Sequence, residues 1–271
     1  MKPVPGVRRG SKLRLAARLI GTARLADVRG FEDQLAAQRS VDGVHDMRVA
    51  TRRLRATLQL FYGSSVASEG VKALADALGE VRDRHVQQAW LAQVAPPLAT
   101  EIGKELPAAE RALLVGLHEW TFRAVPRLVL ALARAKPEGK LSGGKLRRRL
   151  RRRFGEVRAC LAAIDPTHLD AELAHQLRIS VKKLRYQLEV LEPFFGKPYR
   201  RVIERLTALQ EELGELHDAD VRLALLKRLK APAKLSRRVA ADRRTFARAL
   251  VADLAHWQEE EILEKLARRV A

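Results

Sequence analysis

A basic segment occurs twice in this chain, and the two copies align without gaps. Residues 45–55 (HDMRVATRRLR) match residues 175–185 (HQLRISVKKLR) at a constant offset of 130 residues. A second pair of segments follows in the same order, 78–83 (LGEVRD) and 213–218 (LGELHD). Two matched blocks in one order indicate an internal duplication, so we expect each half of the chain to form a unit of the same kind.

The distribution of helix formers and helix breakers predicts an all-α protein. Aromatic residues make up only 5% of the chain although hydrophobic residues make up 47%, which favours helices over strands rich in aromatic and β-branched residues. No segment alternates apolar and polar residues between turn residues as a half-buried strand does. Between clusters of Gly and Pro, the sequence predicts helices at residues 11–38, 44–62, 68–95, 108–135, 145–164, 169–195, 198–230 and 234–270.

Breaks within and between these helices suggest how the chain is organised. Gly21 and Gly30 are weak points of the first helix, and Pro126 should kink the fourth. The Gly- and Pro-containing segment 136–144 is the strongest boundary. We therefore expect one domain made of two repeats, an N-terminal helical bundle at residues 1–137 and a C-terminal helical bundle at residues 138–271.

Each copy of the basic segment places its cations on one side of a helix. At about 100° per residue, the cations of the first copy fall within roughly an 80° arc, with apolar residues opposite. This first cationic row consists of His45, Arg48, Arg52 and Arg55. The second cationic row consists of His175, Arg178, Lys182 and Arg185. Arg53 and Lys183 lie to the side of the two rows.

The charge balance makes a polyanion the expected partner. Lys and Arg number 52 and Asp and Glu only 32, which gives a net charge of +20. Self-repulsion of this size destabilises a compact chain unless an anion offsets it, so the candidates are nucleic acid, an anionic membrane and a phosphate polymer. Solvated helix faces usually mix signs, whereas the first cationic row contains no acid and is mainly Arg, which suits bidentate phosphate contacts.

No set of residues supplies the groups that catalysis needs. The His-Asp pairs at 45–46 and 217–218 could suggest a metal-dependent phosphohydrolase, but more ligands would have to converge on the ion. Gln176 follows His175 where the second copy would need an acid. We therefore expect no enzymatic activity, no cofactor and no metal. His45 and His175 are either anion contacts or structural histidines.

Nucleic acid is the alternative ligand. Seven of the nine residues 145–153 are Lys or Arg, a density found in nucleic-acid-binding segments. These cations wrap most of the way round a helix, however, so only some can face one ligand. No zinc-finger spacing and no recognition helix accompany them. The chain also lacks an apolar run long enough to span a membrane and a secretory signal, so we expect a cytoplasmic protein without membrane insertion.

The repeated segments resemble the conserved histidine α-helical domain (CHAD) family. The resemblance rests on the signature His-x-x-Arg-x-x-x-Arg/Lys-Arg/Lys-Leu-Arg, present at 45–55 and 175–185, and on the Leu-Gly segments that follow. It extends over nearly the whole chain. It implies two pseudo-symmetric four-helix bundles that face each other across a basic central channel. In that family the channel binds inorganic polyphosphate, and some members associate with polyphosphate granules.

The resemblance also implies which residues bind polyphosphate here. In the first half they are His45, Arg48, Arg52, Arg53, Arg55 and Arg82. In the second half they are His175, Arg178, Lys182, Lys183, Arg185 and His217. One position departs from the family pattern. The family usually has Asp two residues after the Arg-Asp of the first Leu-Gly segment, as the second half has at Asp220, but His85 stands there in the first half.

Overall fold

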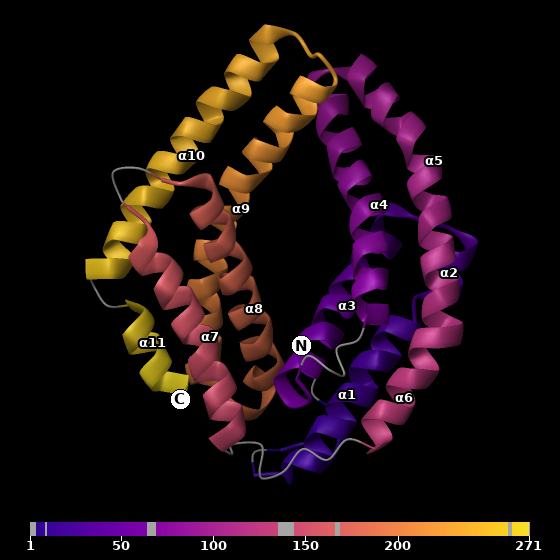
Figure 1. The fold of residues 1–271 in the computed structure, drawn as a ribbon, viewed down its shortest axis with the longest axis vertical. Coiled ribbons are helices and arrows are strands. Elements are labelled where there is room, and N and C mark those ends of the chain that lie inside the picture. The colour runs from indigo at the N-terminus through magenta and orange to yellow at the C-terminus, as the bar shows by residue number, and fades with distance from the viewer. Residues whose placement is uncertain are drawn as a thin grey trace. The chain divides into compact units, whose positions relative to one another are not determined.

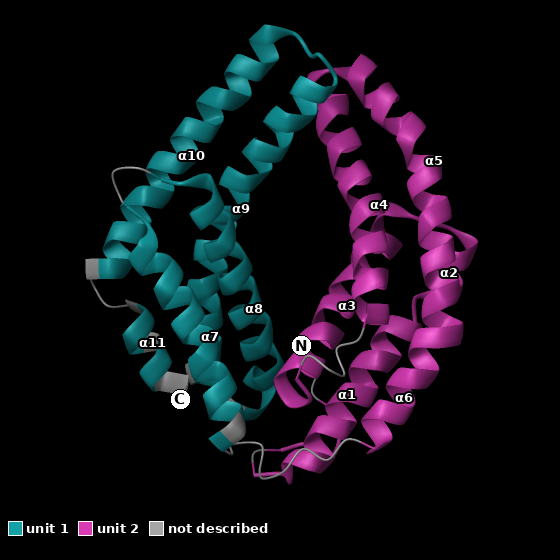
Figure 2. Cartoon of the chain, viewed as in Figure 1, with its two compact units in different colours: residues 1, 144–271 teal, residues 2–143 magenta. Residues whose placement is uncertain are grey.

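Helices make up all the regular structure in the described part of the chain. The computed structural model describes residues 4–8, 10–63, 69–134, 144–165, 169–259 and 262–270. Within them the elements are all helical, with one short π-helix and no strand (Figure 1). The predicted all-α fold is therefore confirmed. The chain divides into two compact units, residues 2–143 and 144–271 (Figure 2). The boundary predicted between residues 137 and 138 lies outside the described residues.

The unit of residues 2–143 is organised around α3 and α4. Its elements are α1 (Leu13–Arg29), α2 (Glu32–Ala37), α3 (Val41–Phe61), α4 (Glu69–Val94), α5 (Pro96–Glu119), η1 (Trp120–Ala124) and α6 (Val125–Arg134). α3 packs against α1 and α4, and α4 packs against α5. The helix predicted at residues 11–38 is divided between α1 and α2 at Gly30 and Phe31, so the weak point expected at Gly30 is present. The one expected at Gly21 is not, because α1 continues through it.

Prolines of this unit stand at the start of helices or within them. The prolines at 96 and 97 predict a break that lasts to residue 107, and this prediction is wrong, because α5 begins at Pro96 and continues through Pro107. The first N–H groups of a helix have no partner within it, so proline in the first turn loses no hydrogen bond. The irregularity expected near Pro126 is present as η1, which ends two residues before that proline.

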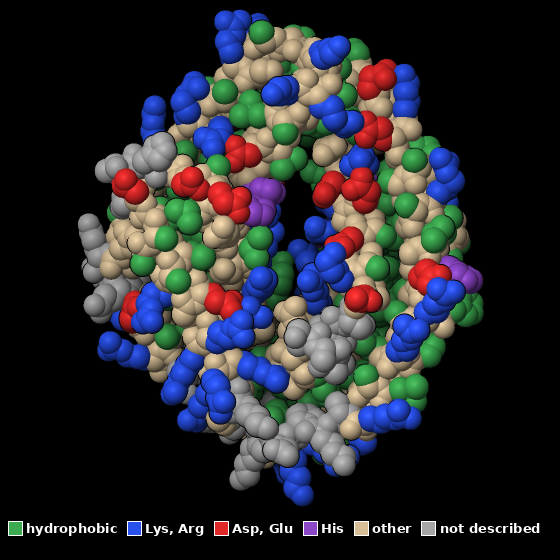
Figure 3. Space-filling view, in the orientation of Figure 1, with side chains coloured by type: hydrophobic (Ala, Val, Ile, Leu, Met, Phe, Trp, Pro, Cys, Tyr) green, Lys and Arg blue, Asp and Glu red, His purple; other side chains and the backbone are tan. Residues whose placement is uncertain are grey.

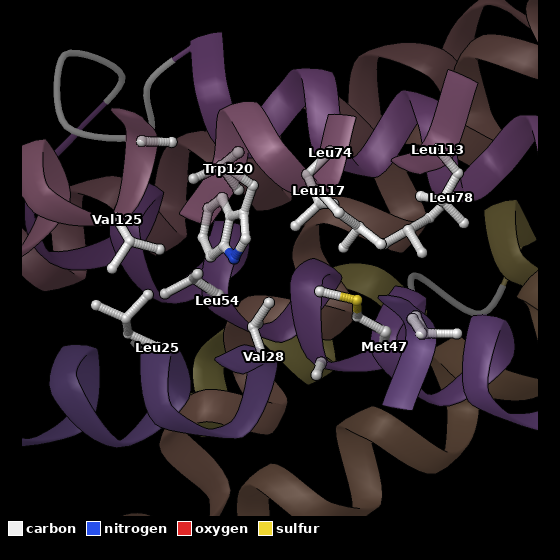
Figure 4. Close-up of a cluster of buried hydrophobic side chains, with 14 of the residues drawn as sticks. Leu25, Val28, Met47, Leu54, Leu74, Leu78, Leu113, Leu117, Trp120 and Val125 are labelled. Carbon is white, nitrogen blue, oxygen red and sulfur yellow. The ribbon is translucent and has the colours of Figure 1, made fainter. Parts of the chain in front are cut away.

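One hydrophobic core holds the helices of this unit together. Figure 4 shows residues of this core from several helices, none of them more than 6% exposed: Leu25, Val28, Met47, Leu54, Leu74, Leu78, Leu113, Leu117, Trp120 and Val125. The residues predicted to lie opposite the first cationic row are all buried: Met47, Ala50, Leu54, Leu58 and Phe61. The predicted register of this helix is therefore confirmed, and its cations are directed away from the core.

The unit of residues 144–271 is built around α8 and α9. Its helices are α7 (Gly144–Ala163), α8 (Ala171–Phe195), α9 (Lys197–Arg228), α10 (Ala233–Glu259) and α11 (Ile262–Val270). α9 packs against α8 and α10, and α7 packs against α8. The single helix predicted at 234–270 is instead α10 and α11, and α11 packs against α7, α9 and α10. The residues predicted to lie opposite the second cationic row are buried: Leu177, Leu184, Leu188 and Leu191.

Candidate anion-binding site

The first cationic row lies along the side of α3 that faces away from the core. The hydroxyl of Ser40 accepts a hydrogen bond from the N–H of Gly43 at 3.1 Å and so caps the start of the helix, just before His45. His45 is exposed, and the three arginines of the row are half-buried. Arginines in such positions bury their aliphatic stems and keep their guanidinium groups near solvent. The row therefore presents positive charge from a rigid helix.

Arg48 extends from α3 toward α4. Its Nε lies 4.0 Å from the position that a β-carbon on Gly79 would take. Arg82 is half-buried on α4 and follows Gly79 by three residues, about one helical turn. The first Leu-Gly segment is therefore packed beside the first cationic row. The structure thus places Arg48 next to the turn of α4 that leads to Arg82.

Arg53 lies on a different face of α3. It lines a pocket of about 480 Å³ between α1 and α3, together with Arg24, Asp27 and Asp46. Burial lowers the pKa of Arg24, Asp27 opposes this change and Arg53 adds to it. Two carboxylates and two guanidinium groups share this pocket, so its charge is balanced. The structure does not bring Arg53 together with the first cationic row, and the polyphosphate contact implied for it stays a prediction.

The second cationic row meets the second Leu-Gly segment at a pair of histidines. The rings of His175 on α8 and His217 on α9 lie 5.4 Å apart between centroids, with 32° between their planes. Burial lowers the pKa of His217, and the positive charges of Arg178, His175 and Lys182 lower it further, while Asp218 opposes them. Three other residues implied for this half therefore act electrostatically on His217.

Arg185, the last residue of the second cationic row, has partners within its own unit. Its Nε donates a hydrogen bond to Oε1 of Gln210 at 2.8 Å, and its guanidinium forms an ion pair with Glu189. The guanidinium carbon also lies 4.5 Å from the centre of the Tyr186 ring. The pair with Glu189 has a visible signal in the sequence, a spacing of four residues on one helix. Lys183, beside the row, is exposed.

Several predicted contacts carry charges that no neighbouring acid neutralises. Among the described residues, Arg48, Arg55 and Arg82 form no ion pair with an acidic side chain. Arg84, two residues after Arg82, instead pairs with Glu80 at 2.5 Å and with Glu105 at 2.9 Å. The structure therefore separates arginines that are already neutralised from arginines that retain their full charge for an external anion.

The dense basic segment 145–153 forms an ordinary amphipathic helix. Leu146 and Leu150 of α7 are buried in the core, and most of the intervening arginines are exposed. Arg153 and Arg152 both pair with Glu156, at 2.6 and 3.1 Å. The cations of α7 thus spread over the surface. In the view of Figure 3, Lys and Arg side chains are likewise scattered over both units.

The described residues contain no group of three or more His, Cys, Asp or Glu side chains that could hold a metal ion. Their helices include none with the length and apolar character needed to cross a membrane.

Comparison with known proteins identifies a family and solved structures of similar fold. The family model described as the CHAD domain matches residues 19–227, a range that includes both cationic rows and both Leu-Gly segments. The crystal structure of the CHAD domain from the plant Ricinus communis is similar, with a TM-score of 0.70 and 23% sequence identity over 99% of this chain and 94% of that chain. At this identity the similarity concerns the fold. No curated protein matches the chain.

Proposed function

This chain belongs to the CHAD domain family, and from that premise we propose that it binds inorganic polyphosphate without catalysing a reaction. The observation that carries the proposal is the set of arginines, Arg48, Arg55 and Arg82, that no acid neutralises within the described residues. A linear polymer with about one charge per unit suits such a row, because many weak contacts add and bound counterions are released.

Both halves of the chain contribute to binding in this proposal. The first cationic row and Arg82 provide contacts from α3 and α4. The second cationic row and His217 provide contacts from α8 and α9, where the pair of histidines adds hydrogen-bond donors to the cations. One long polymer engages both rows at once, as the family resemblance implies. Within the cell, we propose that the protein is cytoplasmic and associates with polyphosphate granules.

Charge reversal in the two rows tests this function. Arg48→Glu and Arg178→Glu should each weaken polyphosphate binding about tenfold or more, since each removes a charge-assisted contact and adds a repulsion. The double variant should abolish binding while the helical circular dichroism signal persists. The matched control is Arg127→Glu with Arg244→Glu, which changes the net charge equally at two exposed arginines outside the rows. An equal loss in the control would show that only net charge matters.

Ligand choice separates this proposal from its alternatives. Polyphosphate of graded length is titrated at physiological salt against duplex DNA and RNA. We expect affinity to rise with polymer length and to exceed that for either nucleic acid. Nucleic acid bound as tightly as long polyphosphate would favour the alternative, a basic nucleic-acid-binding protein. Orthophosphate released only in the presence of divalent metal would favour a metal-dependent phosphohydrolase instead.

A further inference from the structure

A second concave site lies beside Arg82, on a different set of residues from the cationic rows. It has a volume of about 720 Å³ and is lined by the start of α3, the second half of α4 and the start of α5. Its α4 residues mostly recur at intervals of three and four and so share one face of the helix: Arg82, His85, Val86, Gln88, Ala89 and Ala92. The volume falls within the range usual for small-molecule pockets, about 300–1,000 Å³.

The polar part of this pocket contains an unusual histidine. His85 is only 7% exposed, and its Nδ1 is buried without a hydrogen-bond partner among the described residues. Buried polar atoms nearly always have a partner, so the unpaired nitrogen of a side chain that lines a cavity calls for a water or a ligand group to complete its hydrogen bonding. Arg82 lies three residues away on the same face and also lines the pocket. The two side chains offer a cation and a hydrogen-bonding nitrogen side by side.

The remaining walls are mainly apolar, with Gln88 and Thr100 as the two polar exceptions. Val41 at the start of α3 is 50% exposed and Val86 is 44% exposed, which is high for large hydrophobic side chains. Ala89, Ala92 and Ala99 also line the pocket and are named the alanine wall here. Their small side chains leave the volume open. A ligand that covers these surfaces would remove apolar area from water, which is favourable in proportion to the area covered.

The charge of the pocket limits what it can bind. Arg82 is the single permanently charged residue among its lining residues. Glu110, whose negative charge acts on His85, is not among them. A group with one negative charge therefore matches it better than a polyanion does. A carboxylate fits the planar fork of a guanidinium through two parallel hydrogen bonds. It also has a free lone pair to accept a hydrogen bond from His85.

We infer that this pocket binds an amphipathic monocarboxylate, with its carboxylate against Arg82 and His85 and its hydrocarbon chain along the alanine wall. The inference goes beyond polyphosphate binding and does not depend on it, because the pocket is defined without the cationic rows. Arg82 is shared between the two sites, so a bound carboxylate would compete with polyphosphate for this one contact.

Octanoate is the probe, and isothermal titration calorimetry on the full chain without polyphosphate is the measurement. We expect saturable binding at one site, with acetate and octanol each weaker by about tenfold or more, because acetate lacks the chain and octanol lacks the charge. Ala89→Phe fills the pocket and should weaken octanoate by about tenfold or more. Its matched control is Ala73→Phe, at an exposed alanine of the same helix outside the pocket.

Nuclear magnetic resonance of imidazole nitrogens adds a measurement on the unmodified chain. Octanoate should shift the His85 resonances, assigned with His85→Asn, and leave those of His45 unchanged. The inference is wrong if octanoate does not saturate, if octanol binds as tightly, if Ala89→Phe and Ala73→Phe bind octanoate equally, or if the His85 resonances do not move. Polyphosphate affinity of Ala89→Phe should equal that of the parent chain, so failure of one site is distinguishable from failure of the other.

Discussion

The imidazole rings of His175 on α8 and His217 on α9 lie 5.4 Å apart, centroid to centroid. Burial first, and then the positive charges of Arg178, His175 and Lys182, lower the pKa of His217 below its ordinary value, with Asp218 opposing them. An anion bound at the second cationic row would offset those positive charges. It would therefore raise the pKa of His217 and favour the imidazolium form.

Polyphosphate binding should become tighter as the pH falls. A ligand that raises the pKa of a group binds together with a proton. Its affinity therefore increases as the pH falls from the pKa of the bound state to the lower pKa of the free state. We expect affinity about three- to tenfold higher at pH 5.5 than at pH 7.5, since one pKa unit corresponds to about a factor of ten. His217→Gln should flatten this profile. His256→Gln, at an exposed histidine of α10, is the control and should retain it. Identical profiles in the parent chain and His217→Gln would contradict the prediction.

Glu212 on α9 should make the folded chain less stable at high pH. Burial raises its pKa from 4.5 to about 7, and the nearby Asp253 and Glu215 add to the shift. Its Oε2 is buried and has no hydrogen-bond partner among the described residues. Because the folded-state value exceeds the unfolded-state value, the folded chain binds the extra proton between pH 4.5 and about 7. Stability therefore falls as the pH rises through that window.

Removing this charge should stabilise the chain only when the charge is present. With solvent screening taken into account, Glu212→Gln should gain about 1 kcal/mol at pH 8, or roughly 2–4 °C in Tm. At pH 5 the gain should be close to zero, because the parent side chain is then largely protonated. Thermal unfolding at both pH values measures this, with Glu211→Gln at an exposed neighbour as the control. A gain of the same size at both pH values would contradict the charge explanation.

Much of the helix register was predictable because it depends on periodicity alone. The buried positions of α3 and α8 follow from a period of 3.6 residues, and the cations then fall on the other side. Contacts between helices were not predictable in this way. The hydrogen bond from Arg185 to Gln210 joins residues 25 positions apart, and Arg53 turned out to face α1 rather than the row beside it. Both contacts depend on which helices are neighbours in the fold, and the period of a single helix does not contain that information.

Prolines and single polar positions were the least predictable features. A pair of prolines can end one helix or begin the next, and the choice at Pro96 depends on the packing of α5 against α4. The pocket at His85 was missed because its walls come from three helices. Its only signal in the sequence was that His85 replaces the acid seen at Asp220.

The stability of the π-helix η1 should depend on the carboxylate of Glu32. Glu32 accepts hydrogen bonds from Nε1 of Trp120 at 2.9 Å and from Oγ1 of Thr121 at 3.2 Å. Trp120 is 1% exposed, so removing its acceptor leaves a buried donor without a partner. Glu32→Ala should lower the free energy of unfolding by about 2 kcal/mol, and Glu32→Gln by less, because an amide oxygen still accepts. Urea unfolding followed by Trp fluorescence measures both, and Asp33→Ala at the exposed neighbour should change little. Equal effects of the Glu32 and Asp33 variants would contradict this role.

His85 and Asp220 occupy equivalent positions in the two halves, but the first side chain is basic and the second is acidic. Asp220 on α9 pairs with Arg243 of α10, Nε to Oδ1 at 2.5 Å. Burial, the largest cause, and the charge of Arg82 lower the pKa of His85 on α4, while the negative charge of Glu110 on α5 opposes them. In each half, this position therefore lies near a residue of opposite type on the following helix. The acid is Asp220 and the base Arg243 in the second half, whereas the base is His85 and the acid Glu110 in the first.

Placing an acid at position 85 and a base at position 110, as in the second half, should restore stability that His85→Asp alone removes. His85→Asp alone buries a carboxylate near Glu110 and should lower the free energy of unfolding by about 2–3 kcal/mol. Adding Glu110→Arg supplies the partner that Arg243 supplies to Asp220, so the double variant should recover at least about 1 kcal/mol more than the two single changes predict. A double-mutant cycle by urea unfolding measures this coupling, with His85→Asp combined with Arg111→Glu as the control pair, because Arg111 is exposed. If the coupling to position 110 is zero or unfavourable, the two positions do not share a structural role.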